Sequence, residues 1–237
     1  MLHTKAPDIP LDRIHFGVKT CQKLASERLP VLRDTWLPRV SNYALYSDVE
    51  DETLGTISLN IPNSERGHCR KTLGIIRRAA QMDIDWLVIA DDDTLLSPPR
   101  LASLLGPYDP TSSLALGERY AYMIGSGAGF NYLTGGAGMV LSKRTVSLLS
   151  KEGACDCPSS ETPDDMYLGA CLQRQQVPII HSRRFHQARP DDYAPSLLKD
   201  TSPISFHKYW MLDPRQVYSR WLVDPTELRH PQTHQEL

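Results

Sequence analysis

A short apolar run that ends in three consecutive aspartates constrains this chain more than any other feature. Residues 85–90, DWLVIA, are too few for an ordinary helix and end abruptly in charge, which predicts a buried β-strand. A strand after each helix predicts an α/β fold with a mixed, mostly parallel sheet flanked by helices. The other elements expected before this strand are strands at 13–20, 42–47 and 57–62 and helices at 22–37 and 66–82.

The later part of the chain gives fewer indications of regular structure. Stretches rich in proline and polar residues near 97–113 and 187–203 are interpreted as loops. The length of 237 residues suits one large α/β domain, and no linker divides it. We therefore expect a single domain over 1–237, with its core at about 12–225.

Composition excludes several classes of function. The formal net charge of −2 gives no electrostatic reason to expect nucleic acid as a partner. No stretch approaches 18 apolar residues, so no transmembrane segment is expected. The first ten residues also lack the apolar segment of a signal peptide.

The cysteines do not determine the cellular compartment, whereas the last four residues favour a particular compartment. Cys155 and Cys157 lack the second pair that a zinc site requires, so disulfides with one free thiol and a fully reduced protein are both possible. The tail at 226–237 ends in HQEL, which resembles an ER-retrieval signal and predicts the lumen of the endoplasmic reticulum. A retrieval signal without a signal peptide suggests that an N-terminal region is missing. The five cysteines are Cys21, Cys69, Cys155, Cys157 and Cys171.

The acidic triplet is a candidate metal site. Asp91, Asp92 and Asp93 directly follow the predicted strand, and open α/β sheets bind ligands at the carboxyl ends of their strands. Asp91 and Asp93 point to the same side of an extended segment. Mn²⁺ and Mg²⁺ prefer carboxylate oxygens and commonly bridge to phosphates, so a metal–diphosphate site is one interpretation. A solvated acidic turn, or a cap for a helix near Pro98, is the other.

Three further features carry chemistry only in combination. The glycines at 134–138, TGGAG, allow close approach to the backbone but match neither a P-loop nor a dinucleotide-binding fingerprint. Asp164 and Asp165 precede an apolar run at 166–172, where an aspartate either caps a helix or acts as a general base. His186 is either a packed histidine or a ligand for Mn²⁺.

In this order, these motifs resemble those of the fringe-related β1,3-glycosyltransferases over nearly the whole chain, from Phe16 to about Trp210. Each motif is weak alone, and their shared order makes the resemblance specific. The motifs that carry it are Phe16–Thr20, Arg28-Leu29 with Asp34-Thr35-Trp36, the DDD of 91–93, the TGGAG of 134–138, the PDD of 163–165 and Phe185-His186.

The resemblance implies a glycosyltransferase A type fold and a set of site residues. It implies Mn²⁺ held between Asp93 and His186, with help from Asp91, and a general base at Asp165 or, as second choice, Asp164. His207 and Trp210 are expected to line the acceptor side, with core packing the alternative for the tryptophan. The implied contacts to a UDP-sugar donor are Val18, Lys19, Thr20, Lys71, Asp91, Asp92, Gly135 and Gly136.

Three runs indicate a particular branch of this family. They are PDDM at 163–166, FHQARP at 185–190 and PISFHK at 203–208. They resemble members that transfer glucose from UDP-glucose to the 3-hydroxyl of O-linked fucose on thrombospondin type 1 repeats. The alternatives are a fringe-type N-acetylglucosaminyltransferase or galactosyltransferase, a non-catalytic sugar- or protein-binding relative, and a metal-dependent hydrolase, for which a second His-rich metal cluster is lacking.

Overall fold

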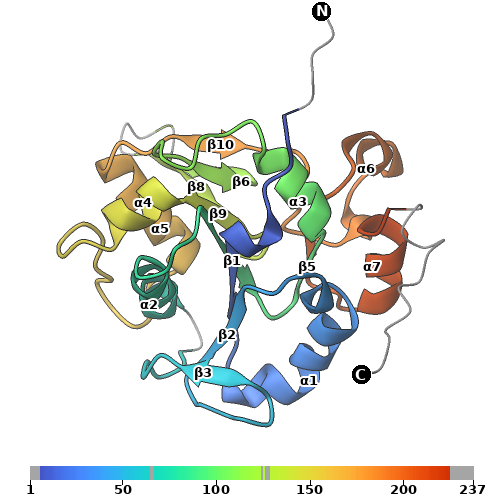
Figure 1. Ribbon diagram of the computed structural model, residues 1–237, viewed down its shortest axis with the longest axis horizontal. Helices are drawn as coiled ribbons and strands as arrows, with labels where there is room; N and C mark the ends of the chain where they lie inside the picture. The colour runs from blue at the N-terminus through green and yellow to red at the C-terminus, as the bar shows by residue number, and fades with distance from the viewer. Residues whose placement is uncertain (1–5, 65–66, 124, 126–128, 225–237) are drawn as a thin grey trace, which may run out of the picture.

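Seven strands form one mixed sheet at the centre of the computed structural model, which describes residues 6–64, 67–123, 125 and 129–224 (Figure 1). Their order is β10-β6-β9-β4-β1-β2-β3. Neighbouring strands are parallel except at β9, which is antiparallel to both β4 and β6. This confirms the predicted mixed, mostly parallel sheet. The strands are β1 (Ile14–Lys19), β2 (Tyr43–Ser47), β3 (Thr56–Ser58), β4 (Trp86–Asp91), β6 (Ala115–Gly117), β9 (Met139–Ser142) and β10 (Ile179–His181).

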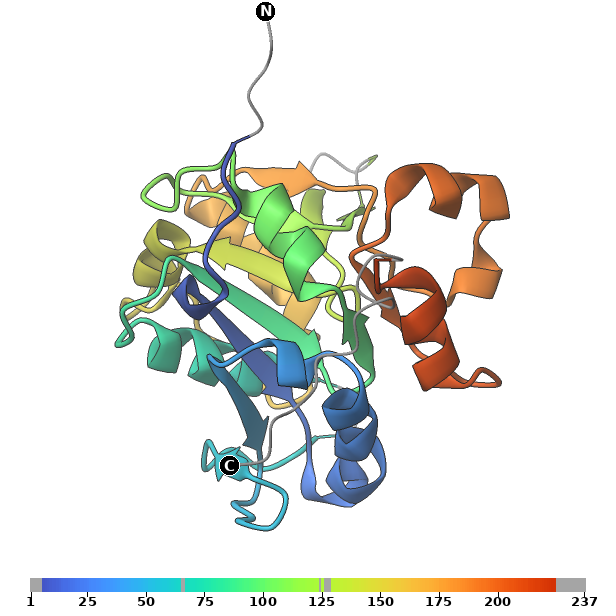
Figure 2. The ribbon, with the colours of Figure 1, turned by 45° about the vertical axis from the view of Figure 1, so that its right-hand side comes forward.

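Helices cover both faces of this sheet (Figures 1 and 2). The side chains of β4 alternate between the two cores, because successive residues of a strand point to opposite faces. Trp86 and Val88 join the core on one face, and Leu87 and Ile89 join the core on the other. The first core is covered by α1 (Gln22–Asp34), α3 (Pro98–Leu105) and α7 (Pro214–Trp221), and the second by α2 (Cys69–Ala79), α4 (Lys143–Leu149) and α5 (Asp164–Arg174).

Two small antiparallel sheets extend from the central one. β5 (Thr94–Leu96) pairs with β11 (Ser205–His207), and this register places His207 opposite Thr94, directly after the acidic triplet. β7 (Arg119–Tyr122) pairs with β8 (Phe130–Leu133) as a hairpin. The first pairing brings residues more than a hundred positions apart in the chain to one place.

The predicted loops are only partly loops. The stretch 97–113 contains α3, and 187–203 contains the 3₁₀ turn η4 (Pro190–Asp192) and α6 (Pro195–Thr201). Pro98 and Pro195 are the first residues of their helices, where no backbone N–H is needed and the fixed φ of proline suits the helix. Pro98 and Pro195 therefore begin helices, and the loop prediction is corrected for α3 and α6.

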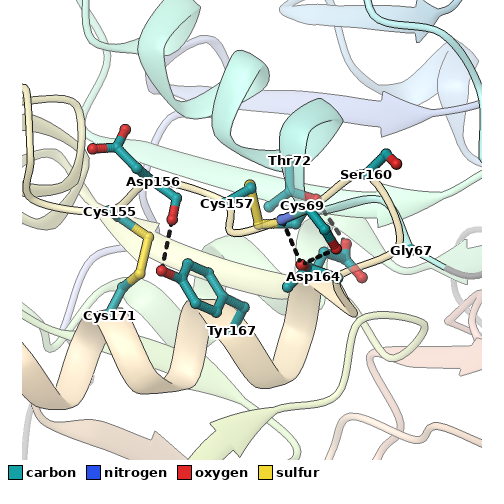
Figure 3. The surroundings of a disulfide bond; sticks show 12 residues. Gly67, Cys69, Thr72, Cys155, Asp156, Cys157, Ser160, Asp164, Tyr167 and Cys171 are labelled. Atoms are coloured by element: carbon teal, nitrogen blue, oxygen red, sulfur yellow. Dashed lines mark hydrogen bonds between the residues drawn. A yellow bond between two sulfur atoms is a disulfide. The ribbon is translucent and has the colours of Figure 1, made fainter.

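Two disulfides connect elements on one side of the sheet (Figure 3). Cys69, at the start of α2, is bonded to Cys157, and Cys155 is bonded to Cys171 of α5. The remaining cysteine, Cys21, is a buried free thiol. Of the two states that the sequence left open, the structure therefore has the one with disulfides and a free thiol.

In the ranges that the structure describes, none of the helices is long and apolar enough to cross a membrane. The HQEL tetrapeptide and the rest of the tail at 226–237 lie outside the described residues.

Candidate metal and nucleotide site

The candidate site lies at the carboxyl ends of the central parallel strands. Lys19 ends β1 and Asp91 ends β4, and the register of the two strands makes these residues neighbours. Ligands of open α/β sheets bind at such strand ends. A cavity of about 390 Å³ opens here, and its lining includes Lys19, Thr20, Arg28, His68, Lys71, the triplet 91–93 and His207.

Two cations neutralise the acidic triplet. The Nζ atom of Lys19 lies 2.9 Å from Asp91 Oδ1, and Arg28 Nη1 lies 2.7 Å from Asp92 Oδ1 and 3.2 Å from Asp93 Oδ2. Burial alone lowers the pKa of Lys19, but the nearby carboxylates, Asp91 among them, more than offset this and raise it. These ion pairs explain how three adjacent carboxylates can follow a buried strand. The site role of Arg28 was missed from sequence, although its motif was visible.

Asp91, Asp93 and His207 form a group that could hold a metal ion. One ligand atom from each lies within 4.8 Å of the others. His207 Nε2 is 3.0 Å from Asp93 Oδ1 and 3.7 Å from Asp91 Oδ2. The side chains of the triplet alternate in direction, as expected. Asp92 is buried and accepts a hydrogen bond from Thr20 Oγ1 at 2.7 Å. Two carboxylates and one imidazole suit a divalent cation.

The imidazole of this group belongs to His207, and His186, the predicted metal ligand, is not part of the group. The ring of His186 is stacked on Phe206 at 4.9 Å between centroids and lies 4.6 Å from the ring of Tyr193. Its Nε2 is buried and has no hydrogen-bond partner among the described residues. Burial lowers the pKa of His186 to about 4. The pairing of β11 with β5, which sequence patterns did not reveal, brings His207 to the triplet instead.

Gly136 is required by the approach of His207. A Cβ atom at position 136 would lie 2.2 Å from His207 Nδ1, so any larger residue would displace the ring. The sequence predicted that this glycine makes room for donor or acceptor, whereas the group that approaches it is a side chain of the protein. The same Nδ1 lies 3.2 Å from the carbonyl oxygen of Gln187, so a proton on Nδ1 leaves the lone pair of Nε2 available to a metal ion.

The two aspartates at the start of α5 differ in their surroundings. Asp164 forms an ion pair with Lys19 and accepts a hydrogen bond from Thr72 Oγ1 at 2.7 Å. Although burial raises the pKa of Asp164, the charge and hydrogen bond of Lys19 hold it well below its usual range. Asp165 forms no such pair with the residues that the structure describes, and it accepts hydrogen bonds from the backbone N–H of Gly135 at 3.3 Å and of Met166 at 2.7 Å.

Burial, followed by the charge of Asp164, raises the pKa of Asp165. A carboxylate whose proton affinity is raised is better suited to accept a proton than one committed to a lysine. Because Asp164 is held by Lys19, Asp165 is the better candidate for a general base.

The remaining predicted residues have three kinds of position: lining the cavity, buried in the core and exposed to solvent. Thr20 and Lys71 line the cavity, and Lys71 Nζ donates to the carbonyl oxygen of Thr20 at 2.5 Å. The side chain of Val18 is fully buried in the core and does not line this cavity, because alternate residues of β1 face away from it. Trp210 is 74% exposed, so the alternative that it packs in the core is wrong.

The fold and this group of side chains define a class: an α/β protein with a candidate divalent-metal site at the carboxyl ends of its parallel strands. Residues 9–231 match the model of the Fringe-like family, and the chain belongs to that family.

Curated relatives agree with this assignment. The chain is 44% identical over 219 residues to the beta-1,3-glucosyltransferase of Mus musculus, and 46% identical over 217 residues to that of Homo sapiens. These matches include 91% and 90% of this chain but only 44% and 43% of the relatives, so the chain spans less than half of their length.

More distant similarities were also found. The chain is 26% identical over 204 residues to the beta-1,3-N-acetylglucosaminyltransferase lunatic fringe of Xenopus laevis, a match covering 76% of this chain and 54% of that protein. A solved glycosyltransferase involved in glycosylation of the major capsid of PBCV-1 aligns with 88% of this chain and 98% of its own, at 14% identity and a TM-score of 0.46.

Proposed function

We propose that this chain is the catalytic part of a metal-dependent, inverting β1,3-glucosyltransferase. It transfers glucose from UDP-glucose to the 3-hydroxyl of O-linked fucose on thrombospondin type 1 repeats. One observation carries this proposal: two adjacent glycines join the candidate metal group to the candidate base. His207 packs on Gly136, and the N–H of Gly135 donates to Asp165.

The donor occupies the cavity at the strand ends in this proposal. Asp91, Asp93 and His207 hold Mn²⁺, which when bound offsets the negative charge that develops on the UDP leaving group. Lys19 and Lys71 line the same cavity and add positive charge beside the diphosphate. Positive charge from a metal ion and two lysines in one cavity would suit the negative charge of a nucleoside diphosphate.

Asp165 acts on the acceptor. Its carboxylate takes the proton from the fucose 3-hydroxyl as that oxygen attacks C1 of glucose. The new bond forms between the oxygen and C1 while the bond from C1 to the UDP oxygen breaks. Because the attack comes from the face opposite UDP, an α-linked donor gives a β-linked product.

Several findings support the choice of sugar and compartment. Identity is 44–46% to the two glucosyltransferases, against 26% to lunatic fringe of Xenopus laevis. The acceptor is inferred from the resemblance of the runs at 163–166, 185–190 and 203–208. Two disulfides are typical of an oxidising compartment, which agrees with the proposed lumen of the endoplasmic reticulum.

A transfer assay tests this function. The protein is incubated with Mn²⁺, a panel of UDP-sugars and a folded, O-fucosylated thrombospondin repeat. Metal-dependent transfer of glucose alone is expected. Transfer of N-acetylglucosamine or galactose would overturn the choice of donor, and absence of transfer by a folded protein that binds UDP would overturn catalysis by this chain.

Two variants separate the proposed roles. Asp165→Asn should keep metal-dependent UDP binding and lose transfer by about 10²–10⁴-fold, the usual effect of removing a general base. Asp93→Ala should lose metal-dependent UDP binding itself. Normal transfer by Asp165→Asn would show that another group accepts the proton.

A further inference from the structure

The hairpin of β7 and β8 carries four aromatic rings on one face. Tyr120 is paired in register with Tyr132, and Tyr122 with Phe130. Ring centroids are 6.2 Å apart for Tyr120 and Tyr132, 5.7 Å for Tyr122 and Phe130, and 6.4 Å for Phe130 and Tyr132. We call these four side chains the aromatic ladder.

The two rings of the ladder that belong to β7 face solvent. Tyr120 is 46% exposed and Tyr122 is 44% exposed, whereas Phe130 and Tyr132 are partly buried. Contacts between paired rings stabilise the hairpin, but they do not require that aromatic rings be left in water. A group of exposed aromatic side chains is typical of a surface that binds another molecule.

The backbone beneath the ladder is held firmly. β8 lies directly against α5, since a Cβ atom at Gly169 would come within 2.4 Å of the Cβ of Tyr132. Leu133, the next residue of β8, is buried in the core. The two rings of β8 are therefore presented by a fixed scaffold to which β7 is paired, and this lowers the entropy lost on binding.

The ladder is continuous with the candidate active site. β8 ends at Leu133, and two residues later the N–H of Gly135 donates to Asp165 at 3.3 Å. Gly169, which packs on Tyr132, is one helical turn after Asp165 and so lies on the same side of α5. Burial and the charge of Asp165 both raise the pKa of Tyr132, in agreement with the packing of Tyr132 on the helix that carries Asp165.

We propose that the aromatic ladder docks the polypeptide of the acceptor next to its glycosylated residue. This inference rests on the proposed function, in which the acceptor sugar lies at Asp165. In this proposal the sugar lies at Asp165, near the end of β8 that carries Tyr132, and Tyr120 and Tyr122 are left to the protein around it. Exposed tyrosines suit this role, because tyrosines that become buried when two proteins bind often dominate the binding energy.

The decisive variant is Tyr122→Ala, compared with Tyr43→Ala. Tyr43 is 41% exposed, but it begins β2 and so lies at the opposite end of the parallel strands from the site. Transfer is measured to a folded, O-fucosylated repeat and to nitrophenyl α-fucoside. Tyr122→Ala should raise KM for the folded repeat about tenfold and leave kcat, KM for the fucoside and UDP binding unchanged. Tyr43→Ala should change none of them.

Other outcomes would overturn the proposal. An unchanged KM for the folded repeat would show that the ladder does not contact the polypeptide. An equal rise of KM for both acceptors would show that it binds the sugar. Sedimentation that detects a dimer in the unmodified protein and a monomer in Tyr122→Ala would show that the ladder joins two copies of this chain.

Failure of the proposed function is recognised separately. If the unmodified protein transfers sugar to neither acceptor, binding of the folded, fucosylated repeat is measured directly. Weaker binding to Tyr122→Ala than to Tyr43→Ala would still support the ladder as a docking surface. Equal binding, or no binding to the unmodified protein, would overturn it.

Discussion

At the scale of single residues, the acidic triplet depends on the charged side chains and the imidazole around it. Three adjacent carboxylates after a buried strand required compensation, and Lys19 and Arg28 provide it. In the candidate metal group, an imidazole accompanies two of these carboxylates. Which histidine supplies it depends on the pairing of β11 with β5, which brings His207 and not His186 to Asp93.

Substitution of the two histidines tests this assignment. His207→Ala should weaken Mn²⁺ binding by at least about tenfold, because one of three ligands is lost. His186→Ala is the matched control: it removes a ring stacked on Phe206, so it should lower stability and leave Mn²⁺ affinity nearly unchanged. Isothermal titration with Mn²⁺ in the presence of UDP measures both. The reverse pattern would restore His186 as the ligand.

The raised pKa of Asp165 predicts where transfer fails in acid. Burial and the charge of Asp164 both disfavour the ionised form of Asp165. A base works only when deprotonated, so kcat should fall about tenfold per pH unit below this pKa, which lies above the ordinary aspartate value of about 3.9. A pH profile of kcat measures this. The residual activity of Asp165→Asn should lack this acid limb, and an identical limb in both proteins would assign it to another group.

At the scale of elements, the disulfides fix helices that carry site residues. Cys69 begins α2, Cys171 lies in α5, and the segment 155–157 connects them (Figure 3). Between the two helices, Thr72 of α2 donates to Asp164 of α5. The sequence allowed disulfides but gave no pairing, because connectivity depends on which cysteines the fold brings together.

Loss of the longer disulfide should be the more costly change. Cys69 and Cys157 are 88 positions apart, whereas Cys155 and Cys171 are 16 apart. Cross-linking a longer loop restricts the unfolded chain more, so Cys69→Ser with Cys157→Ser should cost about 2–5 kcal/mol of unfolding free energy. Replacing Cys155 and Cys171 with Ser is the comparison and should cost less. Denaturant unfolding under non-reducing conditions ranks the two, and the opposite order would show that native packing outweighs loop length.

At the scale of the whole molecule, the site depends on the complete fold. The candidate metal ligands Asp91 and His207 come from β4 and β11, on either side of the hairpin and of α5 in the sequence. Unfolding therefore separates all of these groups at once. A ligand that binds this site binds the folded state and not the unfolded chain.

Donor and metal should consequently stabilise the protein against heat. UDP with Mn²⁺ at about 100 times the dissociation constant should add about 2.7 kcal/mol, which for a chain of this size raises Tm by about 5–10 °C. A chelator should reverse the rise. Asp93→Ala is the control and should show no metal-dependent rise, as measured by scanning calorimetry. A rise of equal size in Asp93→Ala would place the metal elsewhere.

The sequence by itself determined the class of fold and the kinds of chemistry. Alternating short apolar runs and amphipathic segments predicted the mostly parallel sheet, because hydrophobic periodicity is a local property of the chain. The triplet 91–93 and the pair Asp164-Asp165 were likewise identified locally. The helices at 98–105 and 195–201 were missed because proline is compatible with both a loop and a first helical turn.

Only the tertiary structure decided which of these groups act together. It placed His207 rather than His186 beside Asp93, set Gly136 beneath that imidazole, and paired Asp164 with Lys19 so that Asp165 remains available. The reason is physical: contacts between residues far apart in the chain depend on strand order and register, which the whole core selects. Side-chain type is encoded at each position, whereas proximity is a property of the packed molecule.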